Sequence, residues 1–307
     1  MLNKLSQIKS TLNKRLVQSS LTVIWFLKFR KLYSNIDDLF KKLQGKKPVL
    51  YLLEYHIAEH CNMNCKSCFH FSNLAKKAEF GDFEQYVRDL IRLSRLFSNI
   101  KHLHLMGGEP LLNPELPQFI HVTREIFPNT TIHILTNGIL ISKMSKALLE
   151  AIQVCDVRVR VSIYQPMIKK REGIIAFLKE NQIKHWVSDP YLHFAKYLNP
   201  TGDSNPKKVV AGCPASRCTF LSKGRIARCA LPFNIKYFND HFDKKVDMTS
   251  DQIDIHDKQI DGFWVKQQLL KPMSACRFCK KVEWIPWEQS KKSDRSDTTL
   301  DDFCSDA

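Results

Sequence analysis

The chain has 307 residues, of which 44% are hydrophobic, and its formal net charge at pH 7 is +16. The length and hydrophobic content are ordinary for a globular protein, and we expect one large domain with a smaller one. Basic residues (Lys4, Lys9, Lys14, Arg15) interrupt the apolar stretch that a signal peptide needs, so the ten cysteines do not indicate a secreted disulfide scaffold. We therefore expect a cytoplasmic protein whose cysteines bind metal.

Residues 1–47 are predicted to form a basic helical extension, since residues 1–50 carry 11 Lys and Arg against two acids. Anionic partners suit this excess, but no nucleic-acid-binding signature accompanies it, and we expect no nucleic acid. The apolar run at 21–27 is too short to span a bilayer. Residues 21–31 either contact the membrane surface or pack as an ordinary amphipathic helix, and the second reading is favoured.

Between 48 and 200 the pattern alternates strand, loop and helix, which is typical of a parallel sheet with crossover helices. Asp82 is predicted to cap the first of these helices. Strands are expected around 49–57 and at 101–106, 130–135, 156–163, 184–187 and 191–194, and helices at 83–98, 115–127, 142–153 and 166–180.

Three cysteines follow the first strand in the spacing C-x3-C-x2-C: Cys61, Cys65 and Cys68. Three thiolates on one loop can bind three irons of a cubane cluster and leave the fourth iron open to a small molecule. Zinc sites usually need paired C-x2-C units or nearby histidines, so this spacing fits zinc less well.

A second motif ends the strand at 101–106 and consists of Gly107, Gly108, Glu109 and Pro110. Glycines let a backbone approach a ligand closely, and a carboxylate pairs with an ammonium group. The two motifs, in this order, resemble those of the radical S-adenosylmethionine (SAM) enzymes. The resemblance implies an α/β fold, a partial (β/α)6 TIM-like barrel over residues 48–200, and a 4Fe–4S cluster on the three cysteines.

The same resemblance implies that residues 107–110 receive the methionine amino group of SAM, and that Asn137 and Ser162 also contact SAM. Ser67 stands where the family usually has an aromatic residue that packs near the adenine. Phe69 or Phe71 is expected to supply that ring instead.

The fourth strand has a clean period of two, with valines on one face and Arg158, Arg160 and Ser162 on the other. We expect the arginines to be buried in the barrel, where they bind an acidic substrate or the SAM carboxylate, or pair internally with Glu54 or Asp156. Inward histidines (His56, His104, His133) are more often structural than catalytic. Cys155 is expected to be a buried thiol.

A second cysteine group follows the polar stretch 196–208, which is predicted to be a linker. A hairpin with Gly224 at its turn is predicted between Cys213 and Cys229. Later in the chain, a C-x-x-C unit is formed by Cys276 and Cys279. The arrangement resembles the SPASM and Twitch extensions of radical SAM enzymes, and the shorter Twitch type fits better.

This second resemblance implies one auxiliary 4Fe–4S cluster in residues 205–288, on Cys213, Cys229, Cys276 and Cys279. Cys218 is an alternative first ligand, and a four-cysteine zinc site is the alternative chemistry. Residues 289–307 are polar, and we expect a mobile tail.

The resemblance implies an enzyme that reductively cleaves SAM and removes a hydrogen atom from its substrate, with flavodoxin or ferredoxin as reductant. The cysteine loop is followed by the motif His70-Phe71-Ser72, as in a subgroup of the family associated with bacterial surface-glycan genes. This resemblance suggests oxidation of a sugar or glycan precursor. The alternatives are radical modification of a peptide, and a non-catalytic iron–sulfur or zinc scaffold at the membrane.

Overall fold

The computed structural model describes residues 36–216 and 218–305. The chain divides into two compact units, Met1–Pro48 and Val49–Ala307. In the first unit, residues 36–43 are helical. The segment 21–31, for which membrane contact was considered, lies outside the described residues. Within the described residues, no helix is both long and apolar enough to cross a membrane.

The second unit is built on an eight-stranded sheet with the order β5-β4-β3-β2-β1-β7-β8-β9. Its first five strands are parallel, with Leu53 of β1 opposite Leu103 of β2. They are β1 (Val49–Ala58), β2 (Asn99–Gly107), β3 (Thr131–Thr136), β4 (Arg158–Val161) and β5 (Lys184–Val187). The α/β class and the parallel core predicted from the sequence are therefore confirmed.

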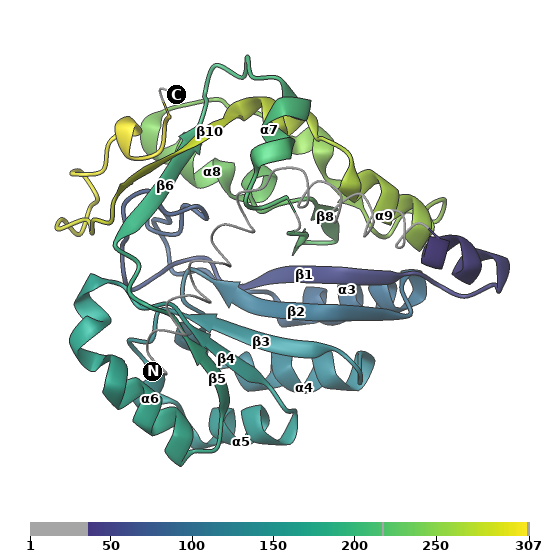
Figure 1. Cartoon of the computed structure of the whole chain (residues 1–307), viewed down its shortest axis with the longest axis horizontal. Coiled ribbons are helices and arrows are strands. Elements are labelled where there is room, and N and C mark those ends of the chain that lie inside the picture. Colours follow the sequence, from purple (N-terminus) through teal and green to yellow (C-terminus); the bar gives the residue numbers. More distant parts are fainter. Residues whose placement is uncertain (1–35, 217, 306–307) are drawn as a thin grey trace, which may run out of the picture. The chain divides into compact units, whose positions relative to one another are not determined.

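Helices connect these strands and cover one face of the sheet, as Figure 1 shows. Asp82 caps the first helix by accepting a hydrogen bond from the Gln85 amide at 2.9 Å, as predicted. The helices are α3 (Phe83–Leu96), α4 (Leu116–Ile126), α5 (Lys146–Val154) and α6 (Arg171–Glu180). Their apolar faces bury residues such as Leu90 and Phe119 against Leu53, Tyr55 and Leu103 in one hydrophobic core.

The expected sixth barrel strand near 191–194 is displaced. Strand β6 (His193–Leu198) pairs antiparallel with β10 (Cys279–Pro286) in a separate two-stranded sheet. The parallel sheet continues at its other edge, where β7 (Phe220–Ser222) pairs with β1. Lys196, expected in a linker, therefore lies in a strand. The local pattern did not reveal its partner, which comes from beyond the second cysteine group.

The C-terminal elements lie on the other side of β1 (Figure 1). The predicted hairpin is confirmed: β7 and β8 (Arg225–Ala227) are joined by Lys223 and Gly224, both at positive φ, in a tight two-residue turn. The remaining elements are β9 (Ile253–Asp254), α7 (Pro206–Gly212), α8 (Leu231–Phe242), α9 (Gly262–Leu270) and the 3-10 helices Pro110–Leu112, Ile141–Lys143, Gln165–Lys170, Thr249–Asp251, Ser274–Phe278 and Leu300–Asp302.

A buried carboxylate ties the hairpin to the helical layer. Asp89 of α3 is fully buried and accepts hydrogen bonds from the Gly224 amide (2.9 Å) and the Gln85 side chain (2.7 Å). The Nε2 atom of His256 lies 2.8 Å from the same carboxylate. This set of contacts holds the hairpin that leads to Cys229 against the barrel.

The stretch from 289 to 305 is not a free tail, which corrects the expectation of a mobile one. Gln289 donates to the Met63 carbonyl (2.7 Å), and Arg295 donates to the Asn64 side chain (2.8 Å) and the Asn73 carbonyl (3.0 Å). Phe303 is buried in a second hydrophobic core with residues such as Phe71 and Phe238. The polar composition misled because these side chains satisfy the backbone of a distant loop.

Candidate active site: two cysteine groups

The first cysteine loop leaves the carboxyl end of β1 and turns sharply. Asn64 and Ser67 have φ angles of 51° and 60°, in the left-handed region that L-residues rarely adopt. Cys65 is buried, whereas Cys61 and Cys68 are partly exposed, and all ten cysteines of the chain are free thiols. The turns bring the three thiols of one short segment to the same end of the barrel.

The glycine motif packs directly under this loop. A Cβ atom on Gly107 would lie 2.1 Å from the Ala58 carbonyl oxygen, and one on Gly108 would lie 2.1 Å from that of His60. The Gly108 amide donates to Ala58 (2.8 Å), and the Glu109 amide donates to His60 (3.0 Å). Only glycines allow β2 to approach the chain that leads into the cysteine loop so closely.

The Glu109 carboxylate is fully buried and accepts three hydrogen bonds. The donors are the Leu111 amide (3.1 Å), the Thr136 hydroxyl (2.7 Å) and the Asn137 amide (2.8 Å). Burial nevertheless raises the pKa of Glu109 to about 7, against the effect of these donors. A carboxylate has about four acceptor sites, so one remains for a further donor, and a cation there would stabilise the ionised form.

Asn137 joins the two motifs. Its backbone amide binds Glu109, and its side-chain Nδ2 donates to Asn62 (2.8 Å) and to the Cys61 sulfur (3.6 Å). Ser162, the other residue expected to contact SAM, follows β4 and donates its amide to the Thr136 carbonyl at 2.9 Å. The structure thus brings Asn137 to the cysteine loop, and sets Ser162 beside the end of β3.

Burial and nearby N–H donors act on the pKa values of the three thiols in opposite directions. Burial raises the pKa of Cys61 to about 12, and the thiol pKa values of Cys65 and Cys68 are also raised by burial. Nearby N–H donors act in the opposite direction, among them the Met63 amide at 3.4 Å from the Cys61 sulfur.

Two of the buried polar groups near this loop that have no hydrogen-bond partner of normal geometry in the described part of the chain can serve as donors to a cluster. They are the indole N–H of Trp287 and the hydroxyl of Ser67, and the indole lies close enough to Cys65 to counter the rise of its pKa. Unpaired buried donors need an acceptor, and the sulfur atoms of a cluster are acceptors. The residues present therefore fit an iron–sulfur cluster on Cys61, Cys65 and Cys68.

Two aromatic residues at this site were missed in the sequence. Tyr164 and Trp287 stack with ring centroids 5.8 Å apart, and burial followed by the three nearby thiols raises the pKa of Tyr164. Phe69 and Phe71, the expected substitutes for an aromatic at Ser67, pack elsewhere. Phe71 lies in the second hydrophobic core, and Phe69 packs on Tyr197 with centroids 4.9 Å apart.

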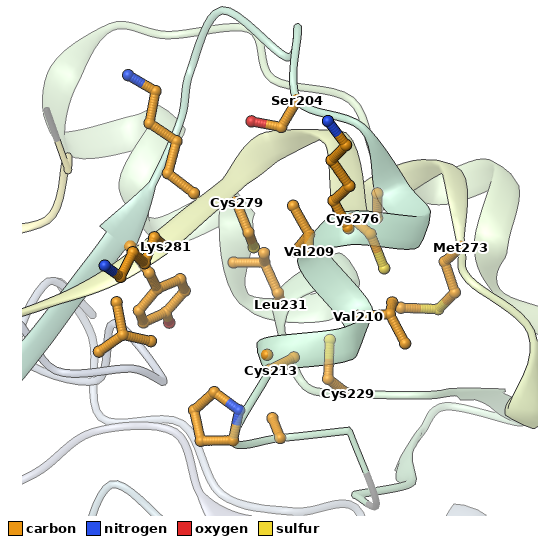
Figure 2. Close-up of a pocket in the computed structure, with 18 of the residues that line it drawn as sticks. Ser204, Val209, Val210, Cys213, Cys229, Leu231, Met273, Cys276, Cys279 and Lys281 are labelled. Atoms are coloured by element: carbon orange, nitrogen blue, oxygen red, sulfur yellow. The ribbon is translucent and has the colours of Figure 1, made fainter. Parts of the chain in front are cut away.

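The second cysteine group surrounds a cavity of about 710 Å³, shown in Figure 2. The cavity is lined by the four thiols expected to act as ligands: Cys213, Cys229, Cys276 and Cys279. They come from the end of α7, the chain after β8, the 3-10 helix at Ser274–Phe278 and the start of β10. Figure 2 shows Cys213 and Cys229 from one side of the cavity and Cys276 and Cys279 from another.

Cys218 does not line this cavity. Its thiol forms a hydrogen bond with the Glu54 side chain on the inner face of β1. The pKa of the Cys218 thiol is raised, mainly by burial and next by the charge of this carboxylate. The same carboxylate lies 3.5 Å from Nδ1 of His104. The pKa of Glu54 is lowered: burial opposes this change, but the His104 side chain 3.5 Å away, the charge of nearby histidines and the Cys218 thiol outweigh it. Glu54 is therefore an ionised carboxylate inside the barrel.

The other inward residues differ from expectation in depth. Arg158 is exposed and Arg160 half-buried, with its guanidinium 5.4 Å from the Trp186 ring centroid, so neither is the buried cation that was predicted. The period-two pattern gave the face but not the openness of that end of the barrel. His56 lies 2.9 Å from both Glu59 and His70, and His133 packs edge-on against His104.

Cys155 is buried, as predicted. Among the described residues, no three His, Cys, Asp or Glu side chains converge as ligands of a single metal ion. Cysteines that hold a cubane each bind a different iron, so they need not converge on one point.

The first cysteine loop and the glycine motif lie in a stretch that matches a known family model. The family model described as "Radical SAM superfamily" matches residues 55–176. Molybdenum cofactor biosynthesis protein 1 from Bos taurus is 32% identical over 110 residues, covering 33% of this chain and 17% of that protein. An S-adenosylmethionine-dependent nucleotide dehydratase from Fibrobacter sp. (strain UWH6) is 35% identical over 92 residues, covering 28% of this chain and 27% of that one.

Among solved structures, BtrN in complex with AdoMet and 2-DOIA aligns with a TM-score of 0.48 at 19% identity, covering 81% of this chain and 97% of that one. The chain spans less than a third of the length of the two curated relatives named here. Residues 55–176, which hold the cysteine loop, the glycine motif and Asn137, are therefore a radical SAM domain.

Proposed function

We propose that this protein is a radical SAM enzyme that removes a hydrogen atom from its substrate. In this superfamily a reduced 4Fe–4S cluster cleaves bound SAM and so supplies an adenosyl radical that abstracts hydrogen. The proposal depends above all on the two hydrogen bonds of Asn137: its side-chain Nδ2 donates to the Cys61 sulfur, and its backbone amide donates to the Glu109 carboxylate. The cluster ligands and the expected receptor of the SAM amino group are thus held as one unit.

Each residue of this unit has a separate task in the proposal. Cys61, Cys65 and Cys68 hold the cluster, and the indole of Trp287 donates toward it. Gly107 and Gly108 allow the close approach of β2 to the chain before the cysteine loop, and Glu109 pairs with the SAM ammonium. Asn137 and Ser162 provide polar contacts to SAM. The stacked pair Tyr164 and Trp287 excludes water from the cluster side.

We further propose an auxiliary 4Fe–4S cluster on Cys213, Cys229, Cys276 and Cys279. The shared cavity supports this set, and the contact of Cys218 with Glu54 argues against that residue as the first ligand. A four-cysteine zinc site is the alternative, and metal analysis distinguishes the two. An auxiliary redox group suits a net oxidation, because it can accept the second electron of the reaction.

We also propose that the substrate is a sugar or glycan precursor, and that the reaction oxidises one of its alcohols to a carbonyl. Such an oxidation removes one hydrogen atom from the carbon, one electron, and one proton from the oxygen. The SAM-derived radical would take the hydrogen atom, and a cluster held by Cys213, Cys229, Cys276 and Cys279 would supply an acceptor for the electron. The proton needs a base, and Glu54 is an ionised carboxylate on the inner face, held by His104 and Cys218. Flavodoxin or ferredoxin is the proposed reductant for the first cluster.

The test is anaerobic reconstitution with iron and sulfide, followed by reduction in the presence of SAM. We expect about eight irons per chain for two cubane clusters and the formation of 5′-deoxyadenosine. A Cys65→Ala variant should keep the auxiliary iron and make no deoxyadenosine. Zinc in place of iron, or a loaded cluster that never cleaves SAM, would refute the enzyme and favour a scaffold. Deuterium transfer to deoxyadenosine from a deuterated peptide, but from no sugar, would refute the sugar assignment.

A further inference from the structure

Arg228 is the feature of the second cysteine group that its proposed ligand set leaves unexplained. It lies between β8 and α8, immediately before Cys229, and it lines the same cavity as the four thiols. Only 7% of its surface is exposed. A guanidinium remains charged at any pH that a protein tolerates, so the chain carries a permanent positive charge at this depth.

The hydrogen bonds of Arg228 leave that charge uncompensated. Nη1 donates to the carbonyls of Leu269 (3.3 Å) and Lys271 (3.0 Å), and Nη2 donates to the carbonyl of Ser216 (2.9 Å). The Nε atom is buried and has no partner in the part of the chain that the structure describes. All three partners are neutral, whereas a buried cation normally needs an anion.

The thiols of the cavity are the groups that this charge acts on. Burial raises the pKa values of Cys213, Cys229 and Cys276, and Arg228 acts on all three in the opposite direction. Lys208, Lys280 and Lys281 also line the cavity, and Figure 2 labels Lys281 there. Lys208 and Lys281 are exposed and Lys280 is partly exposed, so water and salt screen their charges. Arg228 is the lining cation with the least contact with water.

We propose that Arg228 is the charge partner of the anionic group held by the four cysteines, and that it makes this group easier to reduce. The inference rests on the proposed auxiliary cluster. A cluster with four thiolates is negatively charged and gains a further negative charge on reduction. A buried positive charge beside it stabilises the reduced form more than the oxidised form, because charges interact strongly where water is excluded. Arg228 is thus a positioning residue that sets a potential, and it touches no substrate.

The experiment uses the full chain with Cys61, Cys65 and Cys68 replaced by alanine, so that the remaining iron belongs to the auxiliary site. Arg228→Gln removes the charge, and Arg228→Lys keeps it. Arg124→Gln is the matched control, because Arg124 also donates to backbone carbonyls, those of Pro128, Thr130 and Cys155, and does not line the cavity. Lys281→Gln removes a solvated charge at the cavity. Iron content and an anaerobic redox titration followed by electron paramagnetic resonance are the readouts.

We expect Arg228→Gln to shift the reduction equilibrium at least tenfold toward the oxidised cluster, which is 59 mV for a one-electron couple. Arg228→Lys, Arg124→Gln and Lys281→Gln should each stay within threefold of the parent. An unchanged potential in Arg228→Gln with full iron would overturn the inference. So would equal loss of iron in Arg228→Gln and Arg228→Lys, because the carbonyl contacts alone would then explain the residue. A parent protein that takes up no auxiliary iron instead refutes the auxiliary cluster itself.

Discussion

The most direct test of the SAM site is the pH dependence of SAM binding, because Glu109 has a pKa of about 7 in the SAM-free protein. In the proposed site the ammonium group of SAM pairs with the ionised carboxylate, so protonation of Glu109 should compete with binding. With this pKa, the ionised fraction falls from about three quarters at pH 7.5 to about 3% at pH 5.5. Since the SAM amino group remains mostly protonated over this range, we expect its affinity to fall roughly 25-fold.

The stability of the SAM-free protein should rise as the pH falls, because the protonated form of Glu109 is favoured in the folded state. The pKa of Glu109 rises from its ordinary value of 4.5 to about 7 on folding, which corresponds to about 3 kcal/mol. This stabilisation is present in full below pH 4.5 and is lost as the pH rises through 7. SAM should therefore raise the melting temperature more at pH 7.5 than at pH 5.5.

Isothermal titration calorimetry of the reconstituted protein with SAM, under anaerobic conditions, measures the first effect. Glu109→Gln is the control: its affinity should be low and independent of pH, because the amide has no charge and turns an N–H toward groups that are themselves donors. A wild-type affinity that stays constant between pH 5.5 and 7.5 would refute the reasoning. An equal pH dependence in Glu109→Gln would assign the effect to another group.

Three further substitutions test other parts of the site. Gly108→Ala sets a Cβ atom 2.1 Å from the His60 carbonyl oxygen, and calorimetry should show at least a tenfold loss of SAM affinity; full affinity would contradict the close approach. Asp89→Ala leaves the Gly224 amide unpaired and should lower the free energy of unfolding by about 3 kcal/mol in urea titrations, whereas a loss under 1 kcal/mol would show that the tie is weak. Glu54→Gln should keep deoxyadenosine formation but lower product formation about 100-fold, and unchanged product would exclude Glu54 as the base.

The sequence predicted the elements whose signals are local. The helix cap at Asp82, the turn at Gly224 and the strand-to-helix alternation depend on neighbouring residues, and each has the predicted form. The cysteine loop and the glycine motif come together because both follow neighbouring parallel strands. That placement follows from strand order alone.

The residues that escaped prediction reach the site over long sequence distances. Trp287 meets Cys65, and Cys218 meets Glu54, only after the C-terminal elements have packed on β1. Polar composition hid the packing of 289–305 because its contacts are side-chain bonds to the backbone of a distant loop. The prediction that Arg160 is buried was wrong for a different reason. The alternation of side chains along a strand shows which face a side chain lies on, but not how deeply it is buried.

The hydrogen bond from Gln289 to the Met63 carbonyl can form only late in synthesis, well after the cysteine loop has been made. The two residues are 226 positions apart. A ribosome adds about 5–20 residues per second, so the cysteine loop emerges roughly 10 to 45 seconds before the segment that closes over it. Through that interval the thiols stand open to oxidants, and a cluster inserted early would share their exposure. We expect iron to be retained only once this segment is in place, and a chain stopped at residue 288, assayed for bound iron, tests that timing.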